Sequence, residues 1–530
     1  MRFTKVFGLL FCTLATCLAQ PTNQLAVTGY PTLKTVPMSL DDAIRLALEH
    51  DLSLQIERYT PLIVGYNVRS LLGSYYDPVL GAGWRRANGS TEGGGFSPIT
   101  GAQIPGSKSQ DDTTSGSVAG NLPTGMRYEL FNDLNESRNS RPFFFTNPIT
   151  GNLNLNKGTT DNWGADAGIR VTQPLLRNFW TDISRTGIKL RRKDKRIADL
   201  NLEQSVHGAV HSIVSAYYTW VGKLEAIKVA ESDLQVKRQN FDETRRKVEV
   251  GTLAQLDEKK AQSDVALAEG VLIKARNEAA DAEAALKSSI SADFVNQIGV
   301  RLTPTDKLLV LPVTLDLPTS IHTALDKHPS LQAQREVLEK QNIQLKYDFN
   351  QLFPQLDVFA TWGVNGLDQH LSGALSDLER RDFQQDSYGV LFSIPLTLTR
   401  ERNNYKGTKV SKAQAITALQ LAEQNIIFSV EKSIRAVASA YQLVFTSRAG
   451  VVYAQQNLDA EQKKFNAGKS TSFFVLDAAS KLANARNDEI QAEVNYNLAL
   501  NDLAHAEGTI LELRKIDFEA VRYPVAKFAK

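Results

Sequence analysis

Four long stretches of the chain contain no proline and have the composition of α-helices. In the first half of the chain they run from Asp182 to Glu249 and from Leu253 to Ser289. In the second half they run from Glu401 to Asn466 and from Ser472 to Leu513. A helix of roughly 66 residues is about 100 Å long, which is more than a globular core needs. These stretches therefore predict a coiled coil or a helical tube.

The two halves of the chain are related by an internal repeat. Residues 43–58 align without gaps on residues 320–335, and seven of the sixteen positions are identical. Further landmarks recur in the same order: Pro78 and Pro354, Trp84 and Trp362, Pro174 and Pro395, Gly251 and Gly468. Each half is therefore expected to hold short amphipathic helices, two strands around a polar loop, and a long helical hairpin that turns at the glycine.

This pattern divides the chain into five predicted segments. Residues 1–19 form a signal peptide, and residues 20–290 form the first structural repeat. A linker at 291–318 precedes the second repeat at 319–513. Residues 514–530 form a C-terminal tail.

The N-terminus has the features of an export signal. Arg2 and Lys5 precede the apolar stretch Val6–Leu18, and small residues at Cys17 and Ala19 predict cleavage after Ala19. A lipoprotein leader, with Cys17 as the lipidated residue, is the alternative. Either leader takes the protein out of the cytoplasm.

Composition excludes several classes of function. The chain has 60 Lys and Arg against 58 Asp and Glu, so it lacks the basic excess of a nucleic-acid-binding protein. Both cysteines, Cys12 and Cys17, lie in the leader. The rest of the chain therefore has no disulfide, no cysteine zinc site and no cysteine nucleophile.

Short segments with alternating polarity predict β-strands of about ten residues. They cover Val79–Trp84, Trp163–Thr172, Leu356–Val364 and Ser387–Leu396, with aromatic residues near their ends. Such strands are typical of a transmembrane barrel, although an amphipathic soluble sheet gives the same pattern. After the leader, no run of 18 apolar residues predicts a membrane helix. Four strands cannot close a barrel, so a barrel requires several copies of the chain.

The polar stretch between the first two strands, Ala87–Asp161, is rich in Gly, Ser, Thr and Asn and is predicted as a long extracellular loop. Within it, residues 113–122 and 126–134 have the pattern of an added β-hairpin around Pro123-Thr124-Gly125. The sequence leaves open whether this hairpin joins the barrel. The corresponding stretch of the second half, Asn365–Asp386, is short.

The order of these features resembles the TolC-type outer membrane efflux protein family, over nearly the whole chain. The resemblance is carried by Val171–Arg177, by the first tip Val248–Thr252, and by Phe465–Gly468 running into Val475–Ala478. It implies a mixed α/β membrane protein: a trimeric, twelve-stranded barrel in the outer membrane, with four strands per chain, continued by a periplasmic helical tunnel. It further implies a passive channel of a tripartite efflux or type I secretion system in a Gram-negative type bacterium. The implied partners are a periplasmic adaptor protein and an inner-membrane transporter. The resemblance also implies that the linker 291–318 and the tail 514–530 are equatorial, forming a belt around the middle of the tunnel.

The resemblance also assigns candidate site residues. The tips that would dock the adaptor comprise Val250, Gly251 and Thr252 in the first hairpin and Ala467, Gly468 and Lys469 in the second. The periplasmic constriction would comprise Asp257, Asp477, Phe465, Ser470 and Phe474. Rings of Asp257 and Asp477 carboxylates would favour cations, although both also fit ordinary solvated helix charges. Ser470, Phe474 and Phe465 stand where the family's best-known gate has an arginine, an acid and a tyrosine, so that salt-bridge lock is expected to be absent.

The sequence contains no catalytic motif that would indicate an enzyme, and it predicts no metal or cofactor. His207 and His211 share a helix face but lack the glutamate of a zinc-protease helix, so we expect them to face solvent or the tunnel. An exported coiled-coil tether without channel activity remains the alternative function. Drug efflux, metal efflux and protein export all stay open.

Overall fold

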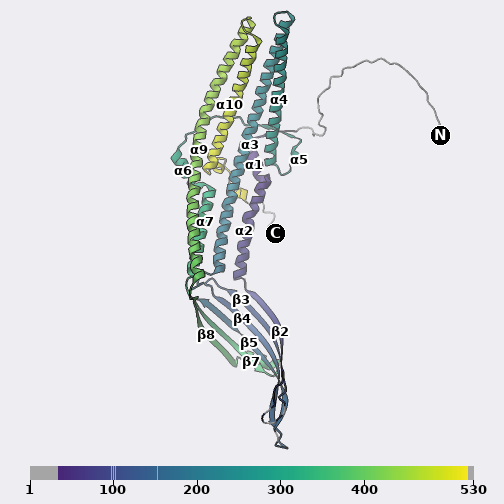
Figure 1. Ribbon diagram of the computed structural model, residues 1–530, viewed down its shortest axis with the longest axis vertical. Coiled ribbons are helices and arrows are strands. Elements are labelled where there is room, and N and C mark those ends of the chain that lie inside the picture. The colour runs from purple at the N-terminus through teal and green to yellow at the C-terminus, as the bar shows by residue number, and fades with distance from the viewer. Residues whose placement is uncertain (1–33, 97, 99–100, 102, 152, 523–530) are drawn as a thin grey trace, which may run out of the picture.

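The computed structural model describes residues 34–96, 98, 101, 103–151 and 153–522. It shows an elongated chain in which a long helical body continues directly into a curved β-sheet (Figure 1). The signal peptide predicted for residues 1–19 lies outside the described residues.

Four long helices form the body: α3 (Ile183–Glu249), α4 (Gln255–Ile290), α9 (Thr399–Asn466) and α10 (Ser472–Ala506). They begin and end close to the predicted positions. The exception is α10, which stops before Leu513 because Gly508 adopts a φ of +71° and starts a turn. Among the described residues, no helix is both long enough and apolar enough to cross a membrane.

Two pairs of shorter helices show the repeat directly. In the first half they are α1 (Leu40–His50) and α2 (Leu52–Tyr76), and in the second half α6 (Leu317–Lys327) and α7 (Pro329–Asn350). α2 packs against α3, whereas α7 packs between α3 and α9. The lower half of the body therefore also contains four helices, and it ends where the sheet begins (Figure 1).

The sheet has six antiparallel strands in the order β2-β3-β4-β5-β7-β8. They are β2 (Val79–Thr91), β3 (Ser107–Asn121), β4 (Arg127–Thr146), β5 (Leu153–Pro174), β7 (Gln355–Asp368) and β8 (Phe383–Ser393). β8 ends before the predicted Leu396 because Pro395 lacks a backbone N–H. The β4–β5 hairpin extends beyond the other strands at the end far from the helices (Figure 1).

The prediction of a loop over Ala87–Asp161 was wrong. β3 and β4 occupy most of this stretch and pair around Pro123-Thr124-Gly125, so the added hairpin is a continuous part of the sheet. Serine, threonine and glycine led to the loop prediction, yet small polar residues also suit strands with one water-facing side. The second-half stretch contains the short helix α8 (Leu371–Arg380) between β7 and β8.

The largest hydrophobic core lies at the middle of the body. There β1 (Lys34–Met38) and β6 (Val300–Pro304) form a two-stranded parallel sheet beside α3. The Trp220 and Tyr217 side chains of α3 are fully buried in this core. The Tyr217 hydroxyl contacts the Met38 carbonyl oxygen at 3.1 Å and the Asp306 carboxylate at 2.9 Å, which ties α3 to both strands.

Short helices from the linker and tail complete this region. They are α5 (Phe294–Gln297), α11 (Ile510–Leu513) and α12 (Phe518–Arg522). Ile510 and Leu511 of α11 are buried in the same core, and Phe518 and Val521 of the tail pack against it, so both halves of the chain and the tail meet here. The five predicted domain boundaries stay predictions.

Candidate functional site

Both helical hairpins turn at the predicted glycines, at the end of the body away from the sheet. Gly251 has a φ of +80° and Gly468 a φ of +72°, the left-handed conformation that glycine adopts without strain. After each glycine the chain closes the same bond, from Thr252 N to Lys247 O and from Lys469 N to Lys464 O, both at 2.8 Å. The two tips therefore have equivalent geometry, as the repeat predicts.

The two tips also touch each other. Phe465 is only 2% exposed, and the Lys247 Nζ of α3 lies 3.3 Å from the centroid of its ring. A cation at this distance from an aromatic face is attracted by the ring quadrupole. The partner of the Phe465 ring is therefore a lysine of the other hairpin within the same chain.

A second contact between the hairpins lies one turn deeper. The Asn240 amide donates to the Ser472 hydroxyl at 2.8 Å, and the Thr244 hydroxyl lies 3.4 Å from the same oxygen. All three residues are buried, so these polar groups have no alternative partner in water. Lys247, Asn240, Thr244 and Ser472 were not among the predicted site residues, because pairing between helices more than 200 residues apart has no local sequence signal.

The remaining aromatic and polar candidates lie around the second tip. Ser470 donates to the Glu461 carboxylate at 2.8 Å, and Lys464 forms an ion pair with the same carboxylate at 2.6 Å. These two contacts lower the pKa of Glu461. Phe474 is 51% exposed beside a hollow of about 510 Å³ that Ser470 and Gly468 also line. Ser470 therefore takes part in a contact within its own hairpin and not in a lock between hairpins.

The two candidate acids lie on different hairpins, each with a local partner. Asp257 accepts from the backbone N–H of Ala254 at 3.3 Å at the start of α4. Asp477 pairs with Lys481 one turn along α10, at 2.8 Å, while its side chain stays 44% exposed. A carboxylate in such a position keeps enough exposure to act on ions in a pore, and the role of both acids remains a proposal.

The histidines were predicted in part incorrectly. His207 is 3% exposed and faces neither solvent nor a tunnel, because α3 packs against α10 at this level. His211 does remain partly exposed and contacts Asp502 at 2.7 Å, and its ring lies 4.8 Å from that of His505. Burial lowers the pKa of both His207 and His505 to about 4. Among the described residues no group of three or more His, Cys, Asp or Glu is arranged to hold a metal ion.

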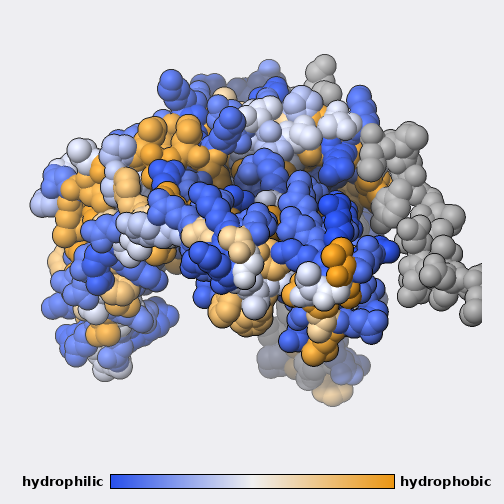
Figure 2. All heavy atoms as spheres, turned by 90° about the horizontal axis from the view of Figure 1, so that it is seen from above, coloured by the Kyte–Doolittle hydropathy of each residue, from blue (hydrophilic) through white to orange (hydrophobic). Residues whose placement is uncertain are grey.

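Both lateral sides of the helical body expose large apolar side chains. On one side they lie on α2 and α4, and on the other side on α9. The exposed residues of the first side are Ile56, Ile63, Tyr66, Leu256, Leu267 and Ile273. Those of the second side are Val410, Leu421, Phe428, Phe445, Val452 and Tyr453. Figure 2, a view from above, shows hydrophobic patches at the surface of the body among hydrophilic side chains. Such extensive exposed apolar surface indicates a missing protein partner.

The sheet has one apolar face and one polar face. Directly paired residues point to the same side, so Leu80, Leu130 and Trp362 share a face through Val118 and Ile169. This apolar face is well exposed, and Leu80 at 78% and Trp362 at 48% show its extent. The opposite, polar face carries rows such as Glu129-Arg170-Thr361-Ser387. This alternation is the pattern of a sheet between lipid and water.

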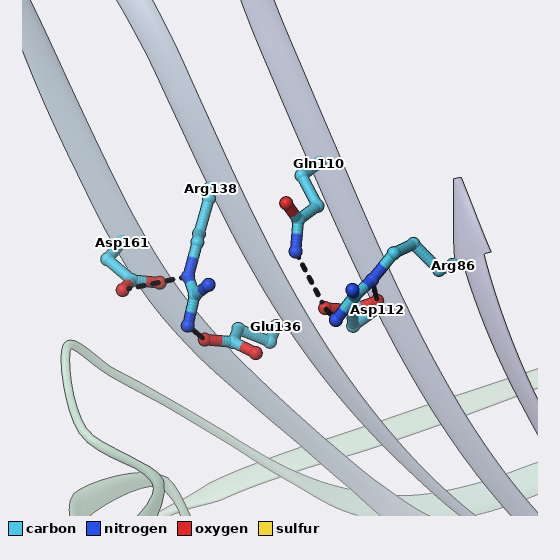
Figure 3. A network of polar contacts seen from close by, with 6 residues as sticks. All are labelled: Arg86, Gln110, Asp112, Glu136, Arg138 and Asp161. Atoms are coloured by element: carbon cyan, nitrogen blue, oxygen red, sulfur yellow. Dashed lines mark hydrogen bonds and ion pairs between the residues drawn. The ribbon is translucent and has the colours of Figure 1, made fainter. Parts of the chain in front are cut away.

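A network of charged side chains lies on the apolar face of the sheet, toward the end that is far from the helices (Figure 3). Arg86 of β2 forms a bidentate pair with Asp112 of β3, at 2.7 and 2.9 Å, and Gln110 donates to the same carboxylate. Arg138 of β4 bridges Glu136 and, at 3.3 Å, Asp161 of β5. The network begins directly after Trp84. A band of apolar and aromatic side chains is therefore followed along the strands by charged side chains, which is the order expected at a membrane surface.

The sheet is open at both edges. β2 pairs only with β3 and β8 only with β7 among the described strands, so each presents one row of unpaired backbone groups. β2 continues from α2, and β8 leads into α9. The open strands therefore lie on the same two sides as the exposed apolar helices. Each side of the described chain thus has both an open strand edge and exposed apolar helix residues.

This combination of a two-faced sheet and a helical hairpin body can be compared with known proteins. The family model described as outer membrane efflux protein matches residues 136–292 and 320–509. The chain belongs to the outer membrane efflux protein family. It is therefore an outer membrane protein with the role of an efflux channel, and its helices extend into the periplasm. The family is a channel family and not an enzyme family.

Individual relatives agree with this assignment. The chain is 23% identical over 406 residues to outer membrane protein TolC of Escherichia coli K12, covering 73% of this chain and 78% of the relative. It is 22% identical over 366 residues to outer membrane efflux protein BepC of Brucella suis, covering 68% and 76%. Outer membrane efflux proteins therefore match most of the chain at low identity.

Solved structures show the same fold. A membrane protein from Pseudomonas aeruginosa superposes with a TM-score of 0.63 at 15% identity, covering 88% of this chain and 90% of that one. The CmeC outer membrane channel of Campylobacter jejuni gives 0.62 at 13% identity, covering 91% and 90%. The TolC-like fold expected from the sequence is thus confirmed. The sheet has six strands per chain, which are the four expected strands and the added hairpin whose place the sequence left open.

Proposed function

We propose that copies of this chain assemble side by side into a homotrimeric channel, the outer membrane component of a tripartite efflux or type I secretion system. The observation that carries this proposal is the matched pair of open sides, β2-α2-α4 and β8-α9, which differ from each other. Different surfaces that bind head to tail form a ring when the rotation from one copy to the next closes, as it does for three copies related by 120°. Such a ring has the apolar sheet face outside and the polar face around a central passage.

The channel is proposed to be passive and powered by its partners. An inner-membrane transporter would deliver substrate, and an adaptor protein would join the two across the periplasm. The tips suit such docking because they expose apolar side chains that no described residue of the chain covers. Val250 is 79% exposed and Phe473 67%. The two residues lie on different hairpins of one chain, so a partner would contact both.

The constriction is proposed to lie near the tips, where Asp257 and Asp477 would form rings of negative charge. Conductance through a planar lipid bilayer tests this proposal. The detergent-extracted protein should give discrete, cation-preferring steps, because carboxylates in a narrow pore attract cations and repel anions. Replacing both acids, Asp257→Asn and Asp477→Asn, should lower the preference for cations several-fold. Asp242→Asn, at an exposed position of α3, is the matched control and should leave it unchanged.

The outcomes separate the parts of the proposal. Steps whose selectivity ignores both substitutions would keep the channel and place its constriction elsewhere. A protein that stays in the aqueous phase and never conducts would overturn the channel. The coiled-coil tether would then be the better account, although it gives no reason for a sheet with a lipid-type face.

A further inference from the structure

We propose that the assembled channel has an eighteen-stranded barrel, to which each of three chains contributes its six-stranded sheet. This inference rests on the proposed function, since it needs a ring of three chains. It differs from the twelve-stranded barrel that four strands per chain would give. The additional strands are β3 and β4, and the barrel is incomplete without the neighbouring copies.

The β3–β4 hairpin lies inside the sheet and is not an appendage on it. β3 pairs with β2 along the full length Val79–Thr91, and β4 pairs with β5 from Arg127 to Thr146. Among the described strands β2 does not pair with β5, because the β3–β4 hairpin lies between them. The barrel therefore cannot close around the hairpin and leave it outside.

The turn of this hairpin is anchored at the junction between the sheet and the helices. Asn121 donates to the Tyr75 carbonyl at the end of α2, at 3.1 Å. Thr124 contacts the Gln173 side chain at 2.9 Å, and the Thr124 carbonyl accepts from the Trp180 backbone N–H at 3.3 Å. The hairpin is therefore held by the segments on both sides of it in the sequence, as a permanent part of the fold requires.

The two additional strands have the same two faces as the rest of the sheet. On β4, Leu130 and Leu134 join the apolar face, whereas Glu129 and Asp133 join the polar face. Glu129 forms an ion pair with Arg170 of β5 at 3.0 Å on that polar face. These strands therefore fit a position between lipid and a water-filled passage, as their neighbours do.

The helices, and not the sheet, are expected to set the number of copies. The α9 edge is about 100 Å long, whereas the β8 edge is only about 37 Å long. Most of the contact between copies thus lies along helices, and each chain supplies four of them at every level of the body. Two copies would restore twelve strands, but only by closing a tube of eight helices. We therefore infer that three chains assemble and that the barrel widens to accept the extra strands.

A wider barrel follows from the strand number. With strands about 4.8 Å apart and tilted by about 40°, eighteen strands give a backbone diameter of about 36 Å, against about 24 Å for twelve. Side chains on the polar face reduce the free diameter to about 24 Å and about 12 Å, respectively. The barrel of this channel would therefore admit a much larger hydrated substrate than a twelve-stranded barrel.

Disulfide cross-linking tests how the barrel closes. The only cysteines of the chain, Cys12 and Cys17, lie in the predicted signal peptide, so new cysteines have no competitors in the processed body. Ala82→Cys on β2 is combined in turn with Tyr388→Cys, Val390→Cys and Phe392→Cys on β8. After oxidation, a non-reducing gel should show a ladder of disulfide-linked dimers and trimers, with no species larger than three chains. Ala82→Cys with Ala438→Cys, far along α9, is the matched control and should give none.

A ladder that ends at two chains would overturn the eighteen-stranded barrel in favour of a twelve-stranded dimer. A conducting trimer in which β2 never cross-links to β8 would also overturn it, while the proposed channel would stand. A protein that neither conducts nor cross-links would overturn both. The two proposals therefore fail in different ways.

Polymer access measures the width directly. Poly(ethylene glycol) of about 8 Å hydrodynamic radius is added only on the side of the bilayer opposite the helical body. It should enter an eighteen-stranded barrel and lower the conductance. Deleting residues 107–146 removes β3 and β4 and leaves a chain that can form four strands, and this variant should exclude the polymer. Deleting residues 143–156 shortens only the projecting tip of β4–β5 and should leave access unchanged. Exclusion of the polymer from the wild-type channel would overturn the proposal.

Discussion

Replacing Trp220 by alanine should lower the free energy of unfolding of the helical body by about 3–5 kcal/mol, the usual cost of removing a large aromatic side chain from a core. Trp220 is fully buried and lies edge-to-face against Tyr217, with ring centroids 5.8 Å apart. The substitution removes a large side chain from the core cluster that also contains Met38 of β1 and Leu302 of β6. Thermal unfolding in detergent, followed by circular dichroism, measures the effect.

Trp220→Phe is the matched control for this prediction. The indole Nε1 has no hydrogen-bond partner, so phenylalanine keeps most of the apolar packing and removes an unsatisfied donor. We expect a loss of less than about 2 kcal/mol. Equal losses for the two variants would mean that the position tolerates no change of shape, and no loss for alanine would show that this core does not hold the body together.

Acidification from pH 7 to pH 5 should destabilise the body by about 2 kcal/mol through His207 alone. Burial lowers its pKa from 6.5 to about 4 in the folded chain, and the neighbouring His505 and His328 act in the same direction, against a smaller opposite effect of Glu512. The unfolded chain therefore takes up a proton below pH 6.5 that the folded chain refuses. Stability is full above pH 6.5 and falls progressively until the pH reaches about 4.

The same measurement with His207→Gln should show a weaker dependence on pH, because the side chain no longer titrates. His370→Asn is the matched control, since that histidine is 81% exposed at its side chain and should contribute little. Unfolding by urea at pH 7 and pH 5 gives both free energies. An unchanged difference between the two pH values in His207→Gln would contradict this role of the buried histidine.

Much of the fold was predictable because its elements are local and repeated. The absence of proline and the glycines at 251 and 468 located the helical hairpins to within a few residues. The alternation of β7 and β5 was equally clear, since large apolar residues such as Trp362 and Ile169 mark one face. Because the strands of one chain are too few to close a barrel, the sequence also predicted that the sheet has open edges. The structure has open edges at β2 and β8.

The strand number and the contacts between the tips were not predictable in the same way. β3 consists mainly of Ser, Thr, Gly and Asp, whose alternation carries almost no hydrophobic signal. The sequence therefore suggested a hairpin here but left its place in the sheet open. The placement of Phe465 beneath Lys247 depends on the packing of α3 against the second hairpin. Residue spacing therefore located the tips, whereas the partners within them required the tertiary structure.

The most direct test of the account is a three-dimensional reconstruction of the full chain extracted from membranes in detergent. The account predicts a three-fold assembly with a passage along its axis, bounded by eighteen strands at one end and by six helical tips at the other. A particle of any copy number without an axial passage would contradict the central claim that this chain is the wall of a channel.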